Sequence, residues 1–461
     1  MCCVTRRSYS IKKVTRSFFF PKKLTSHLLT MNKSKFNKVW ICRKCKQINT
    51  GIKWCHTCNS NHFKNNFKNW TSGNDDIDKF LQNIQLSADN NFKVLEWIPY
   101  ERFYNIEYIA RGGFGTVYKA IWIDGYIRER DNKNQNWKRS GQYTFVALKS
   151  LNYSESVIPK ILNEIILHYK TNECGSNIVQ FFGITQEPRT KNYMMVLEYA
   201  INGNLRNYLD KNYNNLRWKN KIFDLCNIVV GLSQIHDQDL IHRDLHIGNI
   251  LKLSLKTSIC DMGLCSPESK ERQNYSKASD IYSFGIIMYE IISGLPPYHN
   301  VAHNELLAIK ICHGLRPRFN TKVPQSIVHL IKRCLDANPS NRPTANEIRK
   351  ILNQLINNIR HQDDPDFNLY IKEEEQEIEN NFFPNIISSN TGSILSYKTH
   401  SEAIYTSRLL DFNNLPEPKN SDDYYERYDD IISTEYSESL QIDVFSENEW
   451  ETFITSKFNL I

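Results

Sequence analysis

The segment Ile241–Leu251, IHRDLHIGNIL, constrains the fold of this chain more than any other stretch. It places a carboxylate at Asp244 and an amide at Asn249, and a second carboxylate follows at Asp261 in the motif Asp-Met-Gly. An aspartate can act as a general base, and carboxylate and amide oxygens are the ligands that hard divalent cations prefer. The spacing therefore predicts a fold in which two loops bring an acid, an amide and a second acid to one site.

A glycine-rich segment lies upstream at Ile109–Tyr118, IARGGFGTVY. Glycines between two strands let backbone N–H groups approach a phosphate where a side chain would block it. The next predicted strand carries Lys149 in the sequence Val-Ala-Leu-Lys. Glu164 lies in an apolar helical segment, ILNEIILHYK. We expect it to pair with Lys149, because a buried carboxylate without a partner would be costly.

These motifs occur in one order, and VLEYAINGNL, DIYSFG and NRP extend the series at 196–205, 280–285 and 341–343. Together they resemble the motifs of eukaryotic protein kinases, in particular the tyrosine-kinase-like group and an expanded fungal family. The resemblance covers residues 103–359. It implies an α+β, bilobal protein kinase fold with a small β-rich lobe and a large helical lobe. It also implies transfer of the ATP γ-phosphate to Ser or Thr hydroxyls of proteins in signal transduction, with Tyr as the alternative.

The resemblance implies a role for each motif residue. The expected catalytic residues are Asp244 as general base, Lys149, Glu164, Arg243 and His246. The residues expected to hold Mg²⁺ or Mn²⁺ are Asn249 and Asp261. The residues expected to bind ATP are Ala110, Gly112, Gly113, Gly115, Val117, Ala147, Lys149, Glu198 and Ala200. Among them Glu198 and Ala200 would contact the adenine edge through their backbones, next to a gatekeeper at Leu197.

Three positions depart from the family pattern. Ala110 stands where the first glycine of the loop is expected, and its small side chain predicts a modest loss at most. His246 stands where serine/threonine kinases have a lysine, and it is mostly neutral at pH 7. Met262 replaces the phenylalanine of the Asp-Phe-Gly motif, where it is an adequate apolar filler.

The activation segment is the largest departure. After Gly263 come only Leu264 and Cys265 before Ser-Pro-Glu at 266–268. That triplet resembles the Ala-Pro-Glu motif, or it is a remnant of the segment's start. The three Cα–Cα steps from Gly263 to Ser266 reach at most about 11 Å, which is short for a segment that must cross between the two motifs. We therefore expect either that Glu268 fails to reach Arg342 or that the turn at Asp261 is displaced. Two hypotheses follow: a nucleotide-binding pseudokinase that serves as a scaffold, or a gene model that lacks an exon of an active kinase.

A second site is predicted at Trp40–Cys58, where two Cys-x-x-Cys pairs supply Cys42, Cys45, Cys55 and Cys58. Four thiolates at this spacing can hold one structural Zn²⁺ tetrahedrally. The segment resembles a Ran-binding-protein type zinc finger, including Trp40 and Asn49. That resemblance implies a docking element for a partner, with RNA as the less favoured ligand. We place His56 and His62 outside the ligand set.

The chain divides into five predicted regions. They are a basic leader at 1–39, the four-cysteine zinc module at 40–63, a linker with helical content at 64–102, the protein kinase-like domain at 103–360, and an acidic disordered tail at 361–461. The tail holds 22 acidic and 6 basic residues, so it is expected to be solvated or to fold back electrostatically on the basic body. The leader is disordered, a mitochondrial targeting segment, or a stretch preceding the true start at Met31.

Periodicity gives a coarse view of the elements. Residues 103–199 are rich in strands, and the polar stretch 124–142 within them is expected to form a long hairpin loop. Helices are expected at Leu216–His236, Ser279–Ser293, Asn304–His313, Gln325–Leu335 and Thr344–Ile359, the last with Thr344 as its N-cap.

Composition narrows the partners and the compartment. The pattern of twelve cysteines suits a reducing compartment, and no stretch is apolar enough to span a membrane. We therefore expect a cytoplasmic protein that contacts a protein substrate or a scaffold partner. Nucleic acid is not expected, apart from RNA at the zinc module.

Overall fold

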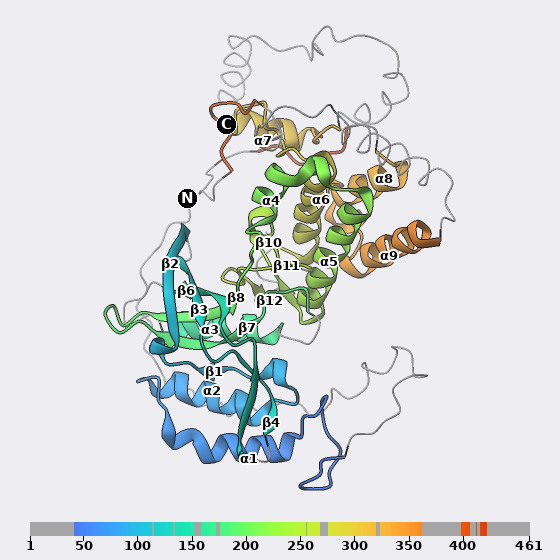
Figure 1. The fold of residues 1–461 in the computed structure, drawn as a ribbon. Helices are drawn as coiled ribbons and strands as arrows, with labels where there is room; N and C mark the ends of the chain where they lie inside the picture. The colour runs from blue at the N-terminus through green and yellow to red at the C-terminus, as the bar shows by residue number, and fades with distance from the viewer. Residues whose placement is uncertain are drawn as a thin grey trace, which may run out of the picture.

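The computed structural model describes residues 41–361, with short gaps, and three pieces of the tail at 398–405, 412 and 415–421 (Figure 1). The gaps are 113–114, 132–133, 152–157, 172–175, 255, 268–274 and 320–322. The predicted basic leader, Trp40 and most of the predicted acidic tail lie outside the described residues.

The small lobe is built on a six-stranded sheet in the order β1-β7-β8-β6-β3-β2. Its strands are β1 (Glu96–Trp97), β2 (Phe103–Gly112), β3 (Gly115–Trp122), β6 (Thr144–Ser150), β7 (Phe181–Gln186) and β8 (Tyr193–Glu198). The central strands β6 and β8 are buried and rich in apolar residues, as expected for strands covered on both faces. The helix α3 (Ile158–Lys170) completes this lobe.

The polar stretch expected as a hairpin loop is a β-hairpin of its own. Its strands β4 (Tyr126–Asp131) and β5 (Asn136–Ser140) pair antiparallel and extend away from the main sheet. Trp137 on β5 stacks on Trp54 of the cysteine module, and Ile127 on β4 is buried in the same cluster. The hairpin therefore attaches the module to the small lobe.

Residues 64–102, assigned to a linker from the sequence, are packed against the sheet. They hold η1 (Phe67–Asn69), α2 (Asp75–Ser87), η2 (Asn91–Lys93), β1 and η3 (Tyr100–Arg102). The apolar residues Ile77, Leu81 and Ile84 recur at helical intervals on α2 and are buried in the small-lobe core. Strand β1 pairs in parallel with β7. The preceding helix α1 (His56–Asn66) packs on α2 (Figure 1).

The large lobe is helical, as predicted. Its helices are α4 (Leu205–Asn212), α5 (Trp218–Asp237), α6 (Lys277–Ser293), α7 (Glu305–Cys312), α8 (Gln325–Cys334) and α9 (Ala345–His361), with short turns η5 (Tyr213–Asn215) and η7 (Pro339–Asn341). A single large hydrophobic cluster joins them. Thr344 caps α9, because its hydroxyl accepts from the N–H of Glu347 at 3.2 Å and its own N–H donates to that carboxylate at 2.7 Å.

Short strands arrange the loops between the lobes. Strand β9 (Leu240–Ile241) precedes η6 (Ile247–Asn249) and β10 (Ile250–Lys252), and β10 pairs with β11 (Thr257–Ile259). Strand β12 (Ser266–Pro267) pairs antiparallel with β9. These pairings bring the segments that carry Asp244 and Asp261 to one place at the base of the small lobe.

Two pieces of the tail are packed against the large lobe around α7, in the orange-red segments of Figure 1. The N–H of His303 donates to Glu402 O at 3.1 Å, and the hydroxyl of Tyr405 donates to Pro297 O at 2.9 Å. Further along, the N–H of Lys419 donates to Cys312 O at 2.9 Å. The contacts are hydrogen bonds to backbone groups, from backbone N–H groups and from side chains, which the predicted charge attraction did not anticipate.

The predicted α+β class is therefore confirmed, with a strand-rich lobe and a helical lobe (Figure 1). Among the helices that the structure describes, none combines the length and the apolar character needed to cross a bilayer.

Candidate active site

Lys149 is the centre of a buried ion cluster between the lobes. Its Nζ lies 2.8 Å from Glu164 Oε1 on α3 and 2.8 Å from Asp261 Oδ1. Burial disfavours the charged amine, but the carboxylates of Asp261 and Glu164 outweigh it and raise the pKa of Lys149. Burial likewise acts against ionised Asp261, yet the charge of Lys149 lowers its pKa below the usual range. Lys149 and Asp261 are therefore both charged at neutral pH.

The loop around Asp244 is anchored by Asp280 at the start of α6. Asp280 Oδ2 accepts from the backbone N–H of His242 at 2.8 Å and lies 2.9 Å from His236 Nε2, and Oδ1 accepts from the N–H of Arg243 at 3.0 Å. Arg243 has a left-handed backbone, with φ of 69°. A non-glycine residue holds such a conformation only where its surroundings fix it. The hydrogen bonds to Asp280 supply that restraint.

Asp244 and Asn249 are joined directly. The amide Nδ2 of Asn249 donates to Asp244 O at 2.9 Å and to Asp244 Oδ2 at 3.2 Å. The ring of His246 accepts from the N–H of Gly248 at 3.1 Å, and its Nε2 lies 3.9 Å from Asp244 Oδ2. The arrangement holds the Asp244 carboxylate half-buried and next to a polar ring.

The donor set of Asn249 and Asp261 fits a hard divalent cation. The Nδ2 of Asn249 is occupied by Asp244, which leaves the amide oxygen as the atom for a metal ion. Asp261 supplies a carboxylate whose lowered pKa keeps it ionised. Oxygen donors of these two types suit Mg²⁺ or Mn²⁺, which take further oxygen ligands from phosphates and water.

The apolar residues expected near adenine line up across the sheet. Val117 lies opposite Lys149 in the β3–β6 register, and Ala147 lies opposite Leu197 in the β6–β8 register. Ala147 packs against the core cluster that contains Leu197, and so does Leu251 of β10. Leu251 was not among the predicted site residues. Its apolar side chain two residues after Asn249 was the available signal.

The two predicted hinge residues, Glu198 and Ala200, make different contacts. The backbone N–H of Glu198 donates to Gln180 O at 2.9 Å, so only its carbonyl remains for an adenine edge. The Glu198 side chain turns to a separate pocket of about 160 Å³, where Lys256 Nζ lies 3.9 Å from its carboxylate. Ala200 is buried beside it, and its carbonyl accepts from the N–H of Gly203.

Two paired strands flank the glycine-rich loop, as expected. Ala110 on β2 lies opposite Val117, and Gly112 lies opposite Gly115. Gly113 lies outside the described residues. Gly115 has φ of 137°, and a Cβ there would lie 2.0 Å from Ser150 O. This glycine is therefore required by the close approach of β3 to β6, a reason that sequence reasoning missed.

The shortened activation segment begins as a strand and then leaves the described residues. Met262 and Cys265 are buried in the large-lobe core, and Ser266–Pro267 form β12 beside β9. This pairing favours the view that 266–267 are the start of the segment. Glu268 lies outside the described residues, so the prediction that it fails to reach Arg342 is untested.

Two arginines that would serve an activation segment contact other groups. Arg342 donates to the backbone carbonyls of Asp336 and Ala278, at 2.8 and 2.9 Å. The guanidinium of Arg243 lies 4.7 Å from the ring centroid of Tyr275. A cation over an aromatic face is stabilised without a phosphate partner.

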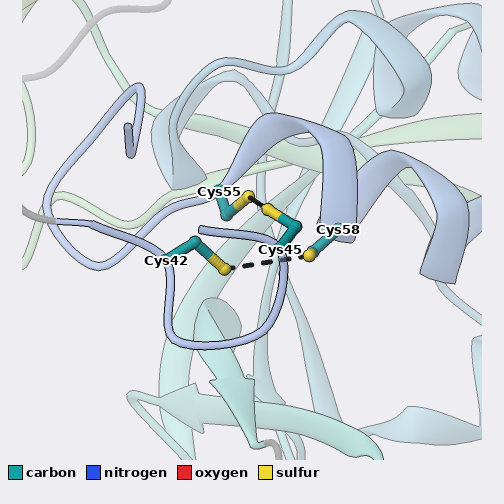
Figure 2. Close-up of side chains that lie close together, drawn as sticks. All are labelled: Cys42, Cys45, Cys55 and Cys58. Atoms are coloured by element: carbon teal, nitrogen blue, oxygen red, sulfur yellow. Dashed lines mark hydrogen bonds between the residues drawn. The ribbon is translucent and has the colours of Figure 1, made fainter. Parts of the chain in front are cut away.

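The four cysteines of the N-terminal module converge, as Figure 2 shows. Cys42 Sγ lies 3.8 Å from Cys58 Sγ, Cys45 Sγ lies 3.4 Å from Cys55 Sγ, and all four sulfurs lie within 4.8 Å of one another. Four thiolates around a zinc ion at about 2.3 Å would lie about 3.8 Å apart. The four residues therefore fit a closed tetrahedral zinc site.

The pKa values of two of these thiols depart from the ordinary range in opposite directions. Burial acts to raise the pKa of Cys42, but hydrogen bonds from the backbones of Cys45 and Lys44 lower this pKa to about 6. Burial raises the pKa of Cys58 to about 12. Because zinc takes thiolates, metal binding at this site would release protons.

Comparison with known proteins gives the same picture of the motif-bearing region. Residues 104–266 and 264–352 match the family model described as protein tyrosine and serine/threonine kinase. The two matched pieces meet where the segment after Gly263 is shortened.

Individual relatives carry both specificities in their names. The chain is 27% identical over 281 residues to tyrosine-protein kinase SPK-1 of Girardia tigrina, which covers 54% of this chain and 52% of that protein. It is 28% identical over 305 residues to mitogen-activated protein kinase kinase kinase 7 of Homo sapiens, covering 61% and 46%. It is 26% identical over 268 residues to the probable serine/threonine-protein kinase drkA of Dictyostelium discoideum, covering 54% and 39%. The chain spans about half the length of the curated relatives it matches.

Proposed function

The chain belongs to the protein tyrosine and serine/threonine kinase family, and on this premise we propose that it transfers the γ-phosphate of ATP to hydroxyl groups of proteins, with Ser and Thr preferred. The observation that carries the proposal is the position of Lys149, whose Nζ lies 2.8 Å from both Glu164 and Asp261. Holding an amine beside a metal-binding carboxylate in a buried cleft is the arrangement that ATP phosphates require.

In the proposed reaction Asp244 accepts the proton of the substrate hydroxyl. The hydroxyl oxygen forms a bond to the γ-phosphorus, and the bond from that phosphorus to the bridging oxygen of ADP breaks. Lys149 pairs with phosphate oxygens and Glu164 holds Lys149 in place. Asn249 and Asp261 would hold a divalent cation, which would neutralise phosphate charge. The contribution of the protein is position and charge.

The nucleotide base fits the apolar strip of Val117, Ala147 and Leu251. The carbonyl of Glu198 and the N–H of Ala200 are the backbone groups proposed for the adenine edge. The glycine turn after Ala110 would cover the phosphates, since backbone N–H groups are the donors there. His246, in the place of a lysine, would donate one hydrogen bond to phosphate through Nε2, because its Nδ1 accepts from the N–H of Gly248.

A second function rests on the short activation segment. Residues 268–275 connect β12 to Ser276, which caps α6. Kinases use the corresponding segment as a platform for the substrate peptide. A chain with so short a connection could bind nucleotide without transferring phosphate, and would then act as a scaffold with the cysteine module as docking element.

One experiment separates the two functions. The full chain is incubated with labelled ATP, Mg²⁺ and a generic protein substrate, beside Asp244→Asn. For a kinase we expect transfer that falls by about 10²–10⁴-fold in the variant, the usual share of a general base. Absence of transfer, together with retained ATP binding, would support the scaffold. Transfer that is equal in both proteins would contradict the role of Asp244.

For the remainder of the chain we propose a structural Zn²⁺ at the four cysteines and a protein partner. A cytoplasmic location is the one that suits the free thiols.

A further inference from the structure

Helix α3, which carries Glu164, rests on a core that residues upstream of the kinase motifs help to build. Glu164 meets Lys149 on the cleft side. The next residue, Ile165, is fully buried in the cluster that also contains Ile77 and Leu81 of α2. Because a close-packed core transmits displacement, the position of α2 bears on the position of α3.

The C-terminal half of α3 has a second tie to the upstream segment. Tyr169 packs against the same cluster, and Lys93 of η2 lies over its ring at 5.5 Å from the centroid. Burial raises the pKa of Tyr169 to about 12, and a hydrogen bond with Ser87 at the end of α2 opposes the rise. The contacts of α3 thus reach both the end of α2 and the turn that follows it.

The cysteine module, in turn, caps the end of α2. The last carbonyls of a helix have no partner within it and need donors from elsewhere. Trp54 Nε1 donates to Ala88 O at 2.9 Å, Ser60 Oγ donates to Leu86 O at 2.8 Å, and Thr50 Oγ1 donates to Asp89 O at 2.6 Å. All three donors belong to the module or to the helix that begins after Cys55.

Apart from Trp54, which is buried, the loops of the module have little apolar core of their own. Ile41, Ile48 and Ile52 are 59%, 68% and 83% exposed. The ordering of these loops therefore depends on the four sulfurs being held together, which in a small site built from four cysteines is the work of the metal.

We propose that metal binding at Cys42, Cys45, Cys55 and Cys58 positions α3 and thereby controls the Lys149–Glu164 pair and nucleotide affinity. Loss of the metal frees the loops, the end of α2 loses the donors from Thr50 and Trp54, and α3 loses its support. Only the part of this inference that concerns nucleotide affinity rests on the proposed nucleotide site. The position of α3 can be measured without ATP.

The first test uses the full chain with bound metal counted by mass spectrometry. A chelator removes the metal, and amide hydrogen exchange is followed in residues 158–170. We expect exchange about tenfold faster there, weaker binding of a fluorescent ATP analogue, and recovery of both when Zn²⁺ is added back. Complete metal release with unchanged α3 exchange, or a purified chain that takes up no Zn²⁺, would overturn the proposal.

A pair of variants distinguishes a specific effect on α3 from general unfolding. Leu81→Ala on α2 and Leu352→Ala on α9 remove the same atoms from two sites that are both 0% exposed. We expect Leu81→Ala to raise α3 exchange and the Kd for the nucleotide, and Leu352→Ala to leave both unchanged. Equal effects of the two variants would contradict the specific path through α2. If the comparison with Asp244→Asn shows no phosphate transfer that depends on Asp244, while hydrogen exchange in α3 still responds to the metal, the proposed catalysis is wrong and this inference is supported.

Discussion

The indole of Trp137 stacks on the indole of Trp54, with ring centroids 5.8 Å apart and planes 8° apart. Trp54 lies between the two cysteine pairs, and Trp137 lies in the hairpin inserted between β3 and β6. Phe63 completes the contact, 4.5 Å from Trp137. The aromatic cluster makes the cysteine module a part of the small lobe.

Removal of this stack should loosen the module. For Trp137→Ala we expect the free energy of unfolding of the small lobe to fall by about 3 kcal/mol, since the change removes a large partly buried ring. Trp137→Phe should cost less than half of that. Thermal unfolding of the full chain, together with the rate of metal release to a chelator, measures both. Equal stability of Trp137→Ala and the parent would show that the hairpin does not hold the module.

The buried ring of His168 on α3 should make the chain acid-sensitive. Its Nε2 donates to Val179 O at 2.7 Å, and burial lowers the pKa of His168 to about 4. The unfolded state binds a proton below about 6.5, whereas the folded state resists it. Stability is therefore complete above pH 6.5 and falls as the pH drops towards 4, by about 1.4 kcal/mol per unit at most.

Urea unfolding between pH 4 and 8 tests this prediction. His168→Gln should flatten the decline between pH 6.5 and 4, because the residue that gains a proton on unfolding is gone. A decline of the same steepness in the variant would assign the acid sensitivity to other groups.

Docking of the tail should resist salt. Residues 398–405 contact the α6–α7 connection through backbone hydrogen bonds and through the ring of Tyr405, which lies 4.8 Å from the ring of His303. Such contacts are not screened by ions, whereas attraction between an acidic tail and a basic body would be. Hydrogen exchange at 299–308 should therefore be equal at about 0.05 and 0.5 M salt, and faster in Tyr405→Ala. Exchange that rises with salt in the parent would restore the electrostatic explanation.

Gly115 should tolerate no side chain. In Gly115→Ala the new Cβ would lie 2.0 Å from Ser150 O, so β3 must shift from β6 just beyond the glycine turn. We expect nucleotide affinity to fall by more than about tenfold, as the shift moves donors away from the phosphates.

Gly203→Ala is the matched control. Gly203 also has a positive φ, of 70°, and a Cβ there would meet no atom within 4 Å. It should cost about 1 kcal/mol of stability from backbone strain alone. Nucleotide binding by calorimetry compares the two, and equal affinity in both would contradict the steric argument.

Local sequence signals predicted the elements well where periodicity was strong. The helices from α5 to α9 begin and end close to the predicted residues, because apolar stripes and the cap at Thr344 are local features. The polar segment 124–142 was expected to be a loop, since nothing local shows that Trp137 meets Trp54. The packing of residues 64–102 could not be predicted for the same reason. Ile77, Leu81 and Ile84 predict a helix, but they do not show which surface the helix packs against.

The sequence by itself determined which chemical groups this protein can use. The acid, amide, lysine and cysteine side chains occur at spacings that are typical of binding sites. Only the tertiary structure decided which of these groups meet. Lys149 reaches Asp261 from far along the chain, Asp280 holds the backbone of Arg243, and the cysteine module caps α2 behind α3. Such contacts arise from burial and from hydrogen bonds between distant segments, and no local sequence pattern predicts them.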